Sequence, residues 1–166
     1  MDVSVHSTHS DTETAELGKT FAERLAPGDV VALYGDLGSG KTEFVRGICE
    51  YFAVSEIVSS PTFTIINQYS GALPEHDEEE IKIYHLDLYR INSKRELEDI
   101  GFSECTNSSD SIKLIEWANK ANGTLPKRHY SVIFRFLPDD DEARSIEIRR
   151  VEETDVEDDI VVSAQA

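Results

Sequence analysis

Eight consecutive residues match the phosphate-binding pattern G-x-x-x-x-G-K-[S/T] at every fixed position: Gly35-Asp36-Leu37-Gly38-Ser39-Gly40-Lys41-Thr42. Glycines let the backbone of such a loop adopt angles that other residues avoid, so that successive N–H groups can point at phosphate oxygens. A lysine at this position bridges the β- and γ-phosphates, and the hydroxyl after it completes the coordination of Mg²⁺. The loop therefore predicts bound ATP and Mg²⁺. The predicted nucleotide contacts here are Asp36, Leu37, Gly38, Ser39, Gly40, Lys41, Thr42 and Glu43.

Two acidic residues are candidates to complete this site. Glu116 ends the apolar run 111–117, and an acid at the carboxyl end of a buried strand is where P-loop proteins place a Mg²⁺ partner. The alternative is an exposed glutamate at a strand end. Strand alternation puts His85, Asp87 and Tyr89 on one face, which is either part of the site or a polar face on water.

A third candidate segment is Ser60-Pro61-Thr62. It follows the glycine-rich loop by about twenty residues, where P-loop hydrolases often carry a segment that senses the γ-phosphate. An ordinary turn before a strand would have the same composition. The position of the segment alone leaves both interpretations open.

The elements around the loop have the order that a phosphate site requires. Ser10 and Glu13 form a capping box that predicts a helix over residues 11–25. Residues 29–34 are an almost wholly apolar run, which is typical of a strand buried on both faces. Apolar residues recur at helical spacing from Thr42 to Phe52. The loop therefore joins a buried strand to a helix.

The rest of the chain predicts a mixed sheet. We expect strands over 62–69, 81–88, 111–117, 129–137 and 144–151 and a short helix over 93–99, with an acid-rich hairpin tip between the first two strands. The predicted fold is an α/β P-loop NTPase with three layers and both parallel and antiparallel strands. We expect a single domain over residues 1–151 and a disordered acidic tail over 152–166.

Composition limits the function further. The net charge is −17, from 33 acidic and 16 basic residues, which disfavours direct binding to nucleic acid. No apolar run reaches the ~18 residues of a membrane span, and the first residues do not resemble a secretion signal, so we expect a cytoplasmic protein. Cys49 and Cys105 lack metal-ligand spacing, and we assign them no chemistry.

Four motifs together resemble one family closely: TsaE, the ATPase component of bacterial tRNA threonylcarbamoyladenosine synthesis. The resemblance runs from about Thr14 to Trp117. Its markers in order are the Gly35 to Thr42 loop, Ser60-Pro61-Thr62-Phe63-Thr64, His85-Leu86-Asp87-Leu88-Tyr89-Arg90 and Ile115-Glu116-Trp117. Many NTPases share the first marker, but the four in this order and spacing are highly specific.

The resemblance implies ATP hydrolysis by a chain docked on the threonylcarbamoyl transferase pair, TsaD and its paralogue TsaB. That pair modifies the adenosine beside the anticodon. Hydrolysis in such proteins resets the transferase between rounds and is weak without the partners. The acidic composition fits this picture, because the partner complex would hold the tRNA.

The resemblance also implies residue roles. Lys41 and Thr42 keep their phosphate and Mg²⁺ roles, and Glu116 becomes the second Mg²⁺ ligand. Asp87 would orient the attacking water or a Mg²⁺-bound water, and Thr62 would sense the γ-phosphate.

Four further residues complete this comparison. The resemblance puts Trp117 near the nucleotide, and it puts Asp11, Thr14 and Arg144 near the purine. Glu43 departs from the family pattern, because many relatives carry a second threonine there, and this change could alter phosphate contacts. The acidic tail is also longer than the family needs.

Three rival functions remain. Asn119-Lys120-Ala121-Asn122 nearly matches the guanine motif N-K-x-D, but Asn122 replaces the aspartate that accepts two guanine hydrogen bonds. A small-molecule kinase would need a cationic lid, and no Arg-rich segment lies between Glu50 and Trp117. A binding module would use bound nucleotide, ATP or GTP, only to order residues 59–64 for a partner.

Overall fold

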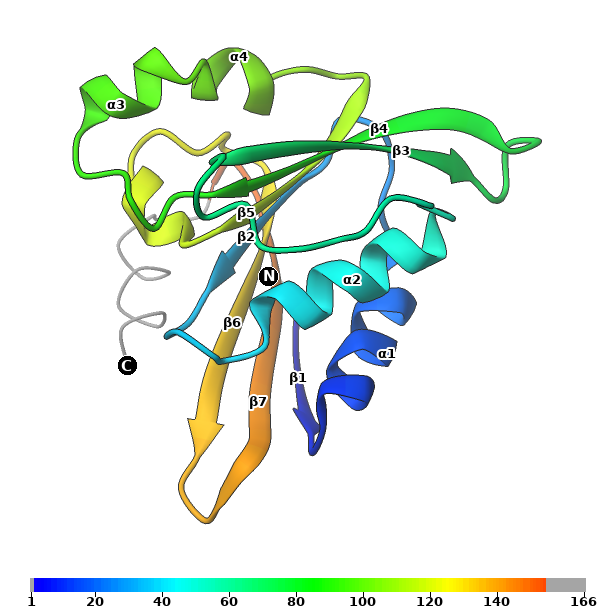
Figure 1. Cartoon of the computed structure of the whole chain (residues 1–166), viewed down its shortest axis with the longest axis vertical. Coiled ribbons are helices and arrows are strands. Elements are labelled where there is room, and N and C mark those ends of the chain that lie inside the picture. Colours follow the sequence, from blue (N-terminus) through cyan, green and yellow to red (C-terminus); the bar gives the residue numbers. More distant parts are fainter. Residues whose placement is uncertain (1, 155–166) are drawn as a thin grey trace.

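The computed structural model describes residues 2–154. Most of the acidic segment 152–166, which we predict to be disordered, lies outside the described residues. A seven-stranded sheet with the order β1-β7-β6-β2-β5-β4-β3 forms the centre of the molecule (Figure 1). The elements are β1 (Val3–Thr8), α1 (Asp11–Ala22), β2 (Val30–Tyr34), α2 (Lys41–Tyr51), β3 (Ile66–Leu73), β4 (Glu79–Asp87), α3 (Lys94–Asp99), α4 (Phe102–Thr106), β5 (Ser111–Glu116), the 3₁₀ helix η1 (Ala118–Ala121), β6 (His129–Leu137) and β7 (Asp140–Val151).

The sheet is parallel at its centre and antiparallel at both edges. β2 pairs in parallel with β5 and β6, and β4 pairs in parallel with β5. β3 runs antiparallel to β4, and β7 runs antiparallel to both β6 and β1. This arrangement confirms the predicted α/β fold with a mixed sheet, and it supplies the strand order that the sequence left undetermined.

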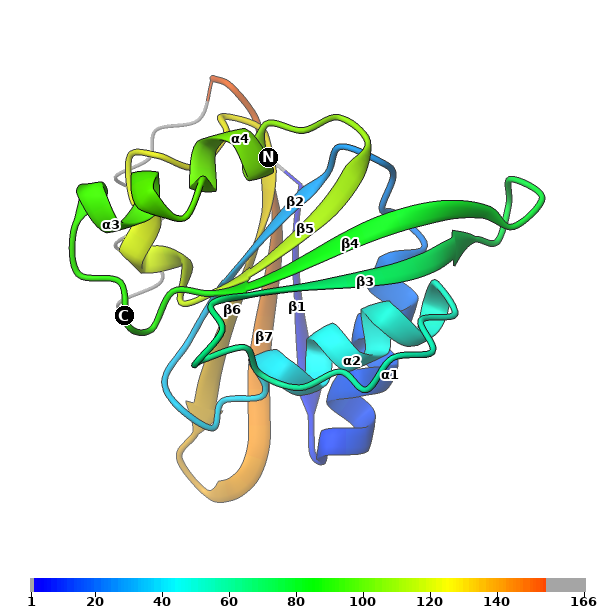
Figure 2. The ribbon, with the colours of Figure 1, turned by 45° about the horizontal axis from the view of Figure 1, so that its top comes forward.

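Helices cover both faces of the sheet and make three layers. Figure 2 shows α1 and α2 on one side and α3 and α4 on the other. Each side has its own hydrophobic cluster: Val31, Leu33 and Ile48 belong to the one under α1 and α2, and Ala32 and Ile115 belong to the other. β2 and β5 contribute to both clusters, which is why every one of their residues is buried.

Some elements differ from the sequence prediction. β1 was not predicted, and α4 and η1 were not predicted either. The first helix ends at Ala22 rather than near residue 25, and β7 begins at Asp140 rather than 144. β3 begins at Ile66 rather than Thr62, because residues 62–64 form a turn and Ile65 has a positive φ of 69°. The hairpin of β3 and β4 is confirmed.

Candidate functional site

A pocket of about 460 Å³ lies where the central parallel strands end at their carboxyl termini. β5 ends at Glu116, whose strand neighbours are Leu33 of β2 and Asp87 of β4. The glycine-rich loop follows β2 and closes the floor of the pocket. The lining residues are Asp11, Leu37, Gly38, Ser39, Gly40, Lys41, Thr42, Glu43, Ser60, Thr62, Asp87, Tyr89, Glu116 and Trp117.

The loop turns through two glycines in the left-handed region. Gly38 has a φ of 77° and Gly40 a φ of 104°, which residues with a side chain rarely adopt. Gly40 directly precedes α2, and the first bond of the helix runs from the N–H of Phe44 to the carbonyl of Gly40. The backbone N–H groups of the residues just before Phe44 therefore lie at the N-terminal end of α2 and do not take part in its first helical bond. Anions bind best at this end of a helix.

Lys41 is almost fully buried, yet its ammonium group is well satisfied. Nζ donates to the carbonyls of Gly35 at 2.6 Å and Asp36 at 2.8 Å, and it lies 4.4 Å from the centre of the Trp117 ring. Burial lowers the pKa of Lys41, and the negative charges of Glu116 and Asp87 act in the opposite direction. A buried cation among acceptors that it could exchange for phosphate oxygens suits an anionic ligand.

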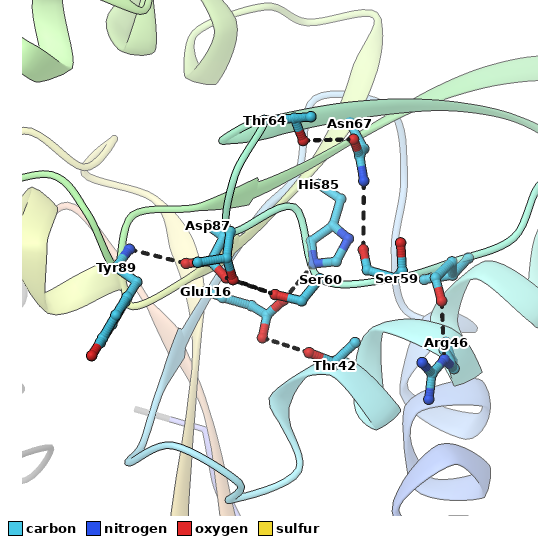
Figure 3. Close-up of polar contacts among 12 residues, drawn as sticks. Thr42, Arg46, Ser59, Ser60, Thr64, Asn67, His85, Asp87, Tyr89 and Glu116 are labelled. Carbon is cyan, nitrogen blue, oxygen red and sulfur yellow. Dashed lines mark hydrogen bonds and ion pairs between the residues drawn. The ribbon is translucent and has the colours of Figure 1, made fainter.

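Thr42 and Glu116 meet from opposite sides of the pocket. The Thr42 hydroxyl donates to Glu116 Oε1 at 2.9 Å, and Glu116 Oε2 accepts from His85 Nε2 at 2.6 Å (Figure 3). Glu116 is only 3% exposed, so the alternative of an exposed strand-end glutamate is wrong. A hydroxyl and one carboxylate are the donor set that Mg²⁺ uses beside nucleotide phosphates. These residues therefore fit the ion, although no group of three or more His, Cys, Asp or Glu side chains within residues 2–154 is arranged to hold a metal by itself.

Asp87 holds the third candidate segment against the pocket. Its Oδ2 accepts from Ser60 Oγ at 2.8 Å, and its Oδ1 accepts from the Tyr89 N–H at 2.9 Å (Figure 3). The same Oδ2 accepts from Thr62 Oγ1 at 2.9 Å. Asp87 is 2% exposed, so the alternative of a polar face on water is wrong for this residue. Ser60-Pro61-Thr62 is thus tied to β4 through its hydroxyls.

Glu43 lines the pocket but turns its carboxylate to its own helix. Arg46 Nη1 pairs with Glu43 Oε1, and Arg46 Nε donates to the carbonyl of Val58 at 3.0 Å. The residue that departs from the family pattern is therefore linked, through Arg46, to the segment that carries Ser60 and Thr62.

The candidates for the purine lie at different depths. Asp11 lines the pocket, at the start of α1. Thr14 is buried, its hydroxyl lies 2.8 Å from that of Thr8, and its methyl group would lie 3.4 Å from a Cβ at Gly40 of the loop. Arg144 stacks on Phe136 at 4.5 Å and donates to the carbonyl of Gly38 at 3.1 Å. Thr14 and Arg144 thus support the loop and are not among the pocket's lining residues.

Two residues to which the sequence assigns no role also belong to the site. Strand alternation places His85 only beside Asp87, and no motif marks Tyr69, yet both are buried and hydrogen-bonded behind Glu116. A histidine two residues before Asp87 on the same strand was the one available signal. Asn119 to Asn122, the near match to a guanine motif, do not line the pocket.

Comparison with known proteins agrees with the resemblance in the motifs. A model of the family described as threonylcarbamoyl adenosine biosynthesis protein TsaE matches residues 8–146. The tRNA threonylcarbamoyladenosine biosynthesis protein TsaE of Bacillus subtilis is 38% identical over 135 residues, which are 81% of this chain and 78% of that protein. The protein of the same name from Treponema pallidum is 34% identical over 132 residues, covering 80% of this chain and 91% of the relative.

A solved structure shares the fold of this chain. The crystal structure of Bacillus subtilis YdiB superposes with a TM-score of 0.70 at 27% sequence identity, covering 99% of this chain and 95% of that chain. No helix within residues 2–154 is long and apolar enough to cross a membrane. Because the family model matches most of the sequence and the curated relatives exceed 30% identity over most of their length, this chain belongs to the TsaE family of threonylcarbamoyladenosine biosynthesis proteins.

Proposed function

We propose that this chain binds ATP with Mg²⁺ and hydrolyses it, as the ATPase subunit that works with TsaD and TsaB in modifying the adenosine beside the anticodon of tRNAs. The observation that carries the proposal is the contact between Thr42 Oγ1 and Glu116 Oε1, 2.9 Å apart, directly beside the glycine-rich loop. It presents two oxygen donors next to a phosphate-binding loop and a buried lysine.

Each residue has a defined task in this proposal. Bound Mg²⁺ would neutralise charge on the β- and γ-phosphates. Thr42 and Glu116 would hold the ion through their oxygen atoms. Lys41 exchanges the carbonyls of Gly35 and Asp36 for phosphate oxygens as nucleotide binds.

The attacking water is assigned to the opposite wall of the pocket. The Asp87 carboxylate orients it, and the Thr62 hydroxyl turns from Asp87 Oδ2 toward the γ-phosphate. Weak hydrolysis by the isolated chain follows, because Asp87 is occupied by Ser60, Thr62 and the N–H of Tyr89 until that segment rearranges.

The surface beside this segment supports a partner-activated mechanism. Ile57 is 90% exposed and Phe63 is 82% exposed, and these apolar side chains flank Ser60 and Thr62 in the sequence. A protein that covers them would also cover the pocket and exclude water from it. The net charge of −17 supports access to tRNA only through such a partner. A cytoplasmic location is part of the proposal.

One observation favours a second candidate function. Both Asp87 oxygens are engaged by residues 60, 62 and 89, so Asp87 could serve only to hold the segment in place. In that case the chain would be a nucleotide-dependent switch, for ATP or GTP, with little hydrolysis.

The deciding experiment measures Mg²⁺-dependent hydrolysis of ATP and GTP by the purified chain, alone and with a purified TsaB–TsaD pair. We expect ATP hydrolysis to rise when the pair is present, and we expect Glu116→Gln to lower it about a hundredfold by removing one charged ligand. Glu147→Gln is the matched control, because Glu147 is another strand carboxylate that is ion-paired with Arg135 and Arg149 outside the pocket.

The outcomes separate the two candidate functions. The ATPase is supported if the TsaB–TsaD pair stimulates hydrolysis by the wild type and by Glu147→Gln but not by Glu116→Gln. The switch is supported if the wild type and Asp87→Asn both bind nucleotide and sustain tRNA modification without measurable hydrolysis. Failure to bind either nucleotide excludes both.

A further inference from the structure

A line of polar groups, buried at its inner end, connects Glu116 to the backbone of Ser59, the residue before Ser60 in the pocket lining. His85 Nε2 lies 2.6 Å from Glu116 Oε2, and His85 Nδ1 lies 3.3 Å from the Tyr69 hydroxyl. The Tyr69 oxygen lies 3.5 Å from the carbonyl of Ser59, and Asn67 Nδ2 lies within 3.5 Å of both oxygens. The line ends on the backbone directly before Ser60, as the contact between Asn67 and Ser59 in Figure 3 shows.

The line is continuous for either form of the imidazole. A carboxylate oxygen only accepts hydrogen bonds, so His85 donates from Nε2. In the neutral ring Nδ1 accepts from the Tyr69 O–H, and Asn67 then bridges Tyr69 to the Ser59 carbonyl. In the charged ring Nδ1 donates to Tyr69, whose own proton is then available to Ser59. The link to Ser59 therefore does not depend on the charge of His85.

Burial makes the inner part of this line responsive to changes at Glu116. His85 is 0% exposed and Tyr69 is 4% exposed, so solvent does not replace a partner lost there, whereas Asn67 is half-buried and Ser59 is exposed. A shift of the Glu116 carboxylate must be followed by His85 or leave a buried donor unpaired. His85 and Asp87 also lie two residues apart on β4. Asp87 accepts from the hydroxyls of Ser60 and Thr62, while the Ser59 carbonyl is contacted from β3, by Asn67 and Tyr69.

We propose that His85 and Tyr69 are positioning residues that couple the occupancy of the Thr42–Glu116 oxygens to the conformation of residues 58–64. This inference rests on the proposed function and adds a mechanism to it. Binding of an ion and a phosphate group beside the Thr42 hydroxyl would displace the carboxylate of Glu116. His85 and Tyr69 would then transmit this movement to Ser59. Thr62 is thereby released from Asp87 only when the site is filled.

The test uses variants that cut the line at different places. Tyr69→Phe keeps the buried ring and removes only the hydroxyl between His85 and Ser59. His85→Gln keeps a donor that can reach Glu116 and loses the ring nitrogen that contacts Tyr69. His85→Asn places its amide near Tyr69 and loses the contact with Glu116. Tyr84→Phe is the matched control, because Tyr84 is a neighbouring tyrosine on β4 that packs against the cluster on the other face of the sheet.

Three measurements report on the full-length chain. Tryptophan fluorescence follows the binding of Mg²⁺ and a non-hydrolysable ATP analogue. Hydrogen exchange of the backbone amides of residues 58–64 is measured with and without that analogue. The kcat and KM of ATP hydrolysis are measured with the TsaB–TsaD pair. We expect the analogue to change exchange at residues 58–64 in the wild type and in Tyr84→Phe.

We expect the two uncoupling variants, Tyr69→Phe and His85→Gln, to bind the analogue within about threefold of the wild type but to show no change of exchange at residues 58–64. Their kcat should fall about tenfold with KM nearly unchanged, as for a coupling of ordinary size. His85→Asn should instead require more Mg²⁺ for half-maximal binding, because Glu116 has lost its buried donor.

Other results would overturn the proposal. If Tyr69→Phe and His85→Gln retain the nucleotide-dependent exchange of the wild type, the line serves only to satisfy buried polar groups. If the wild type binds the analogue without any change at residues 58–64, the two sites are not coupled, although nucleotide binding itself stands. If the wild type does not bind the analogue at all, the proposed function fails together with the coupling.

Discussion

The ammonium group of Lys41 lies under the ring of Trp117, with 4.4 Å between Nζ and the ring centre. Trp117 follows β5 directly and has a φ of 57°, a left-handed conformation that is uncommon for a bulky residue and costs on the order of 1 kcal/mol or more. Tyr89 packs against the same ring at 5.0 Å. The backbone strain therefore places an aromatic face over the cation that the proposed function assigns to the phosphates.

The first prediction uses Trp117 as a reporter, because it is the only tryptophan in the chain. Adding Mg²⁺ and ATP should change its fluorescence, since Lys41 leaves the ring when it turns to the phosphates. Lys41→Met keeps the long side chain and removes the charge, so it should abolish the change at the same nucleotide concentration. A fluorescence titration checks this, and an unchanged titration in Lys41→Met would mean that the signal arises elsewhere.

The second prediction concerns the exposed side chains beside the pocket. Ile57→Ser and Phe63→Ser should raise the TsaB–TsaD concentration needed for half-maximal stimulation about tenfold each, because each removes apolar surface worth roughly 1.5–3 kcal/mol when buried. Hydrolysis without the pair should not change, since neither side chain lines the pocket. Val5→Ser is the control, because Val5 is an exposed apolar residue on the edge strand β1. Equal effects in all three variants would contradict a specific docking surface.

The third prediction concerns the close approach of α1 and α2. A methyl group at Gly47 would lie 1.8 Å from the carbonyl oxygen of Ala15, which belongs to the backbone and cannot rotate away. Gly47→Ala should therefore lower the free energy of unfolding by about 3 kcal/mol or more, although alanine normally stabilises a helix. Urea unfolding measures the loss. Glu16→Ala, on the exposed side of α1, should change stability by no more than about 0.5 kcal/mol.

The fourth prediction concerns pH. Burial, with a smaller contribution from the charge of Glu56, raises the pKa of the Cys49 thiol from its ordinary 9.0 to about 12. The folded state then keeps this proton to a higher pH than the unfolded chain. The resulting stability is fully present below pH 9 and is lost as the pH rises toward 12.

Unfolding under reducing conditions at several pH values between 9 and 11 measures this effect. The wild type should lose up to about 1.4 kcal/mol more per pH unit than Cys49→Ala, whichever of the two is more stable at pH 8. Parallel loss in both proteins would show that the thiol does not lose its proton on unfolding in this range.

The nucleotide loop could be predicted because its signals are local. Its motif is contiguous, and the run before it is apolar at every position from Val30 to Tyr34 because both faces of β2 are covered. The alternatives at Glu116 and Asp87 could not be decided in the same way. Burial separates them, and burial depends on β2, β4 and β5 lying side by side.

Other features depend on contacts between distant residues. Thr62 to Ile65 have the composition of a strand but form a turn, since the hydroxyls of Ser60 and Thr62 bond Asp87, which lies 27 and 25 residues away in the sequence. The pair of His85 and Glu116 joins residues 31 apart. β1 was missed because its alternating residues are only half-buried at the edge of the sheet. Local propensity carries none of this information.

The pairing of β1 with β7 has a consequence for synthesis on the ribosome. Val3 lies opposite Arg149, so the first strand to be made has its partner among the last described residues. At roughly 5–20 residues per second, the nascent chain must hold this strand unpaired for about 7 to 30 s after it emerges. Ser10, the cap of α1, follows β1 by two residues, and Asp11 begins the helix at the pocket rim. A chain that stops before β7 would leave β1 without its partner, and it would also lack Arg144, which donates to the carbonyl of Gly38 in the glycine-rich loop.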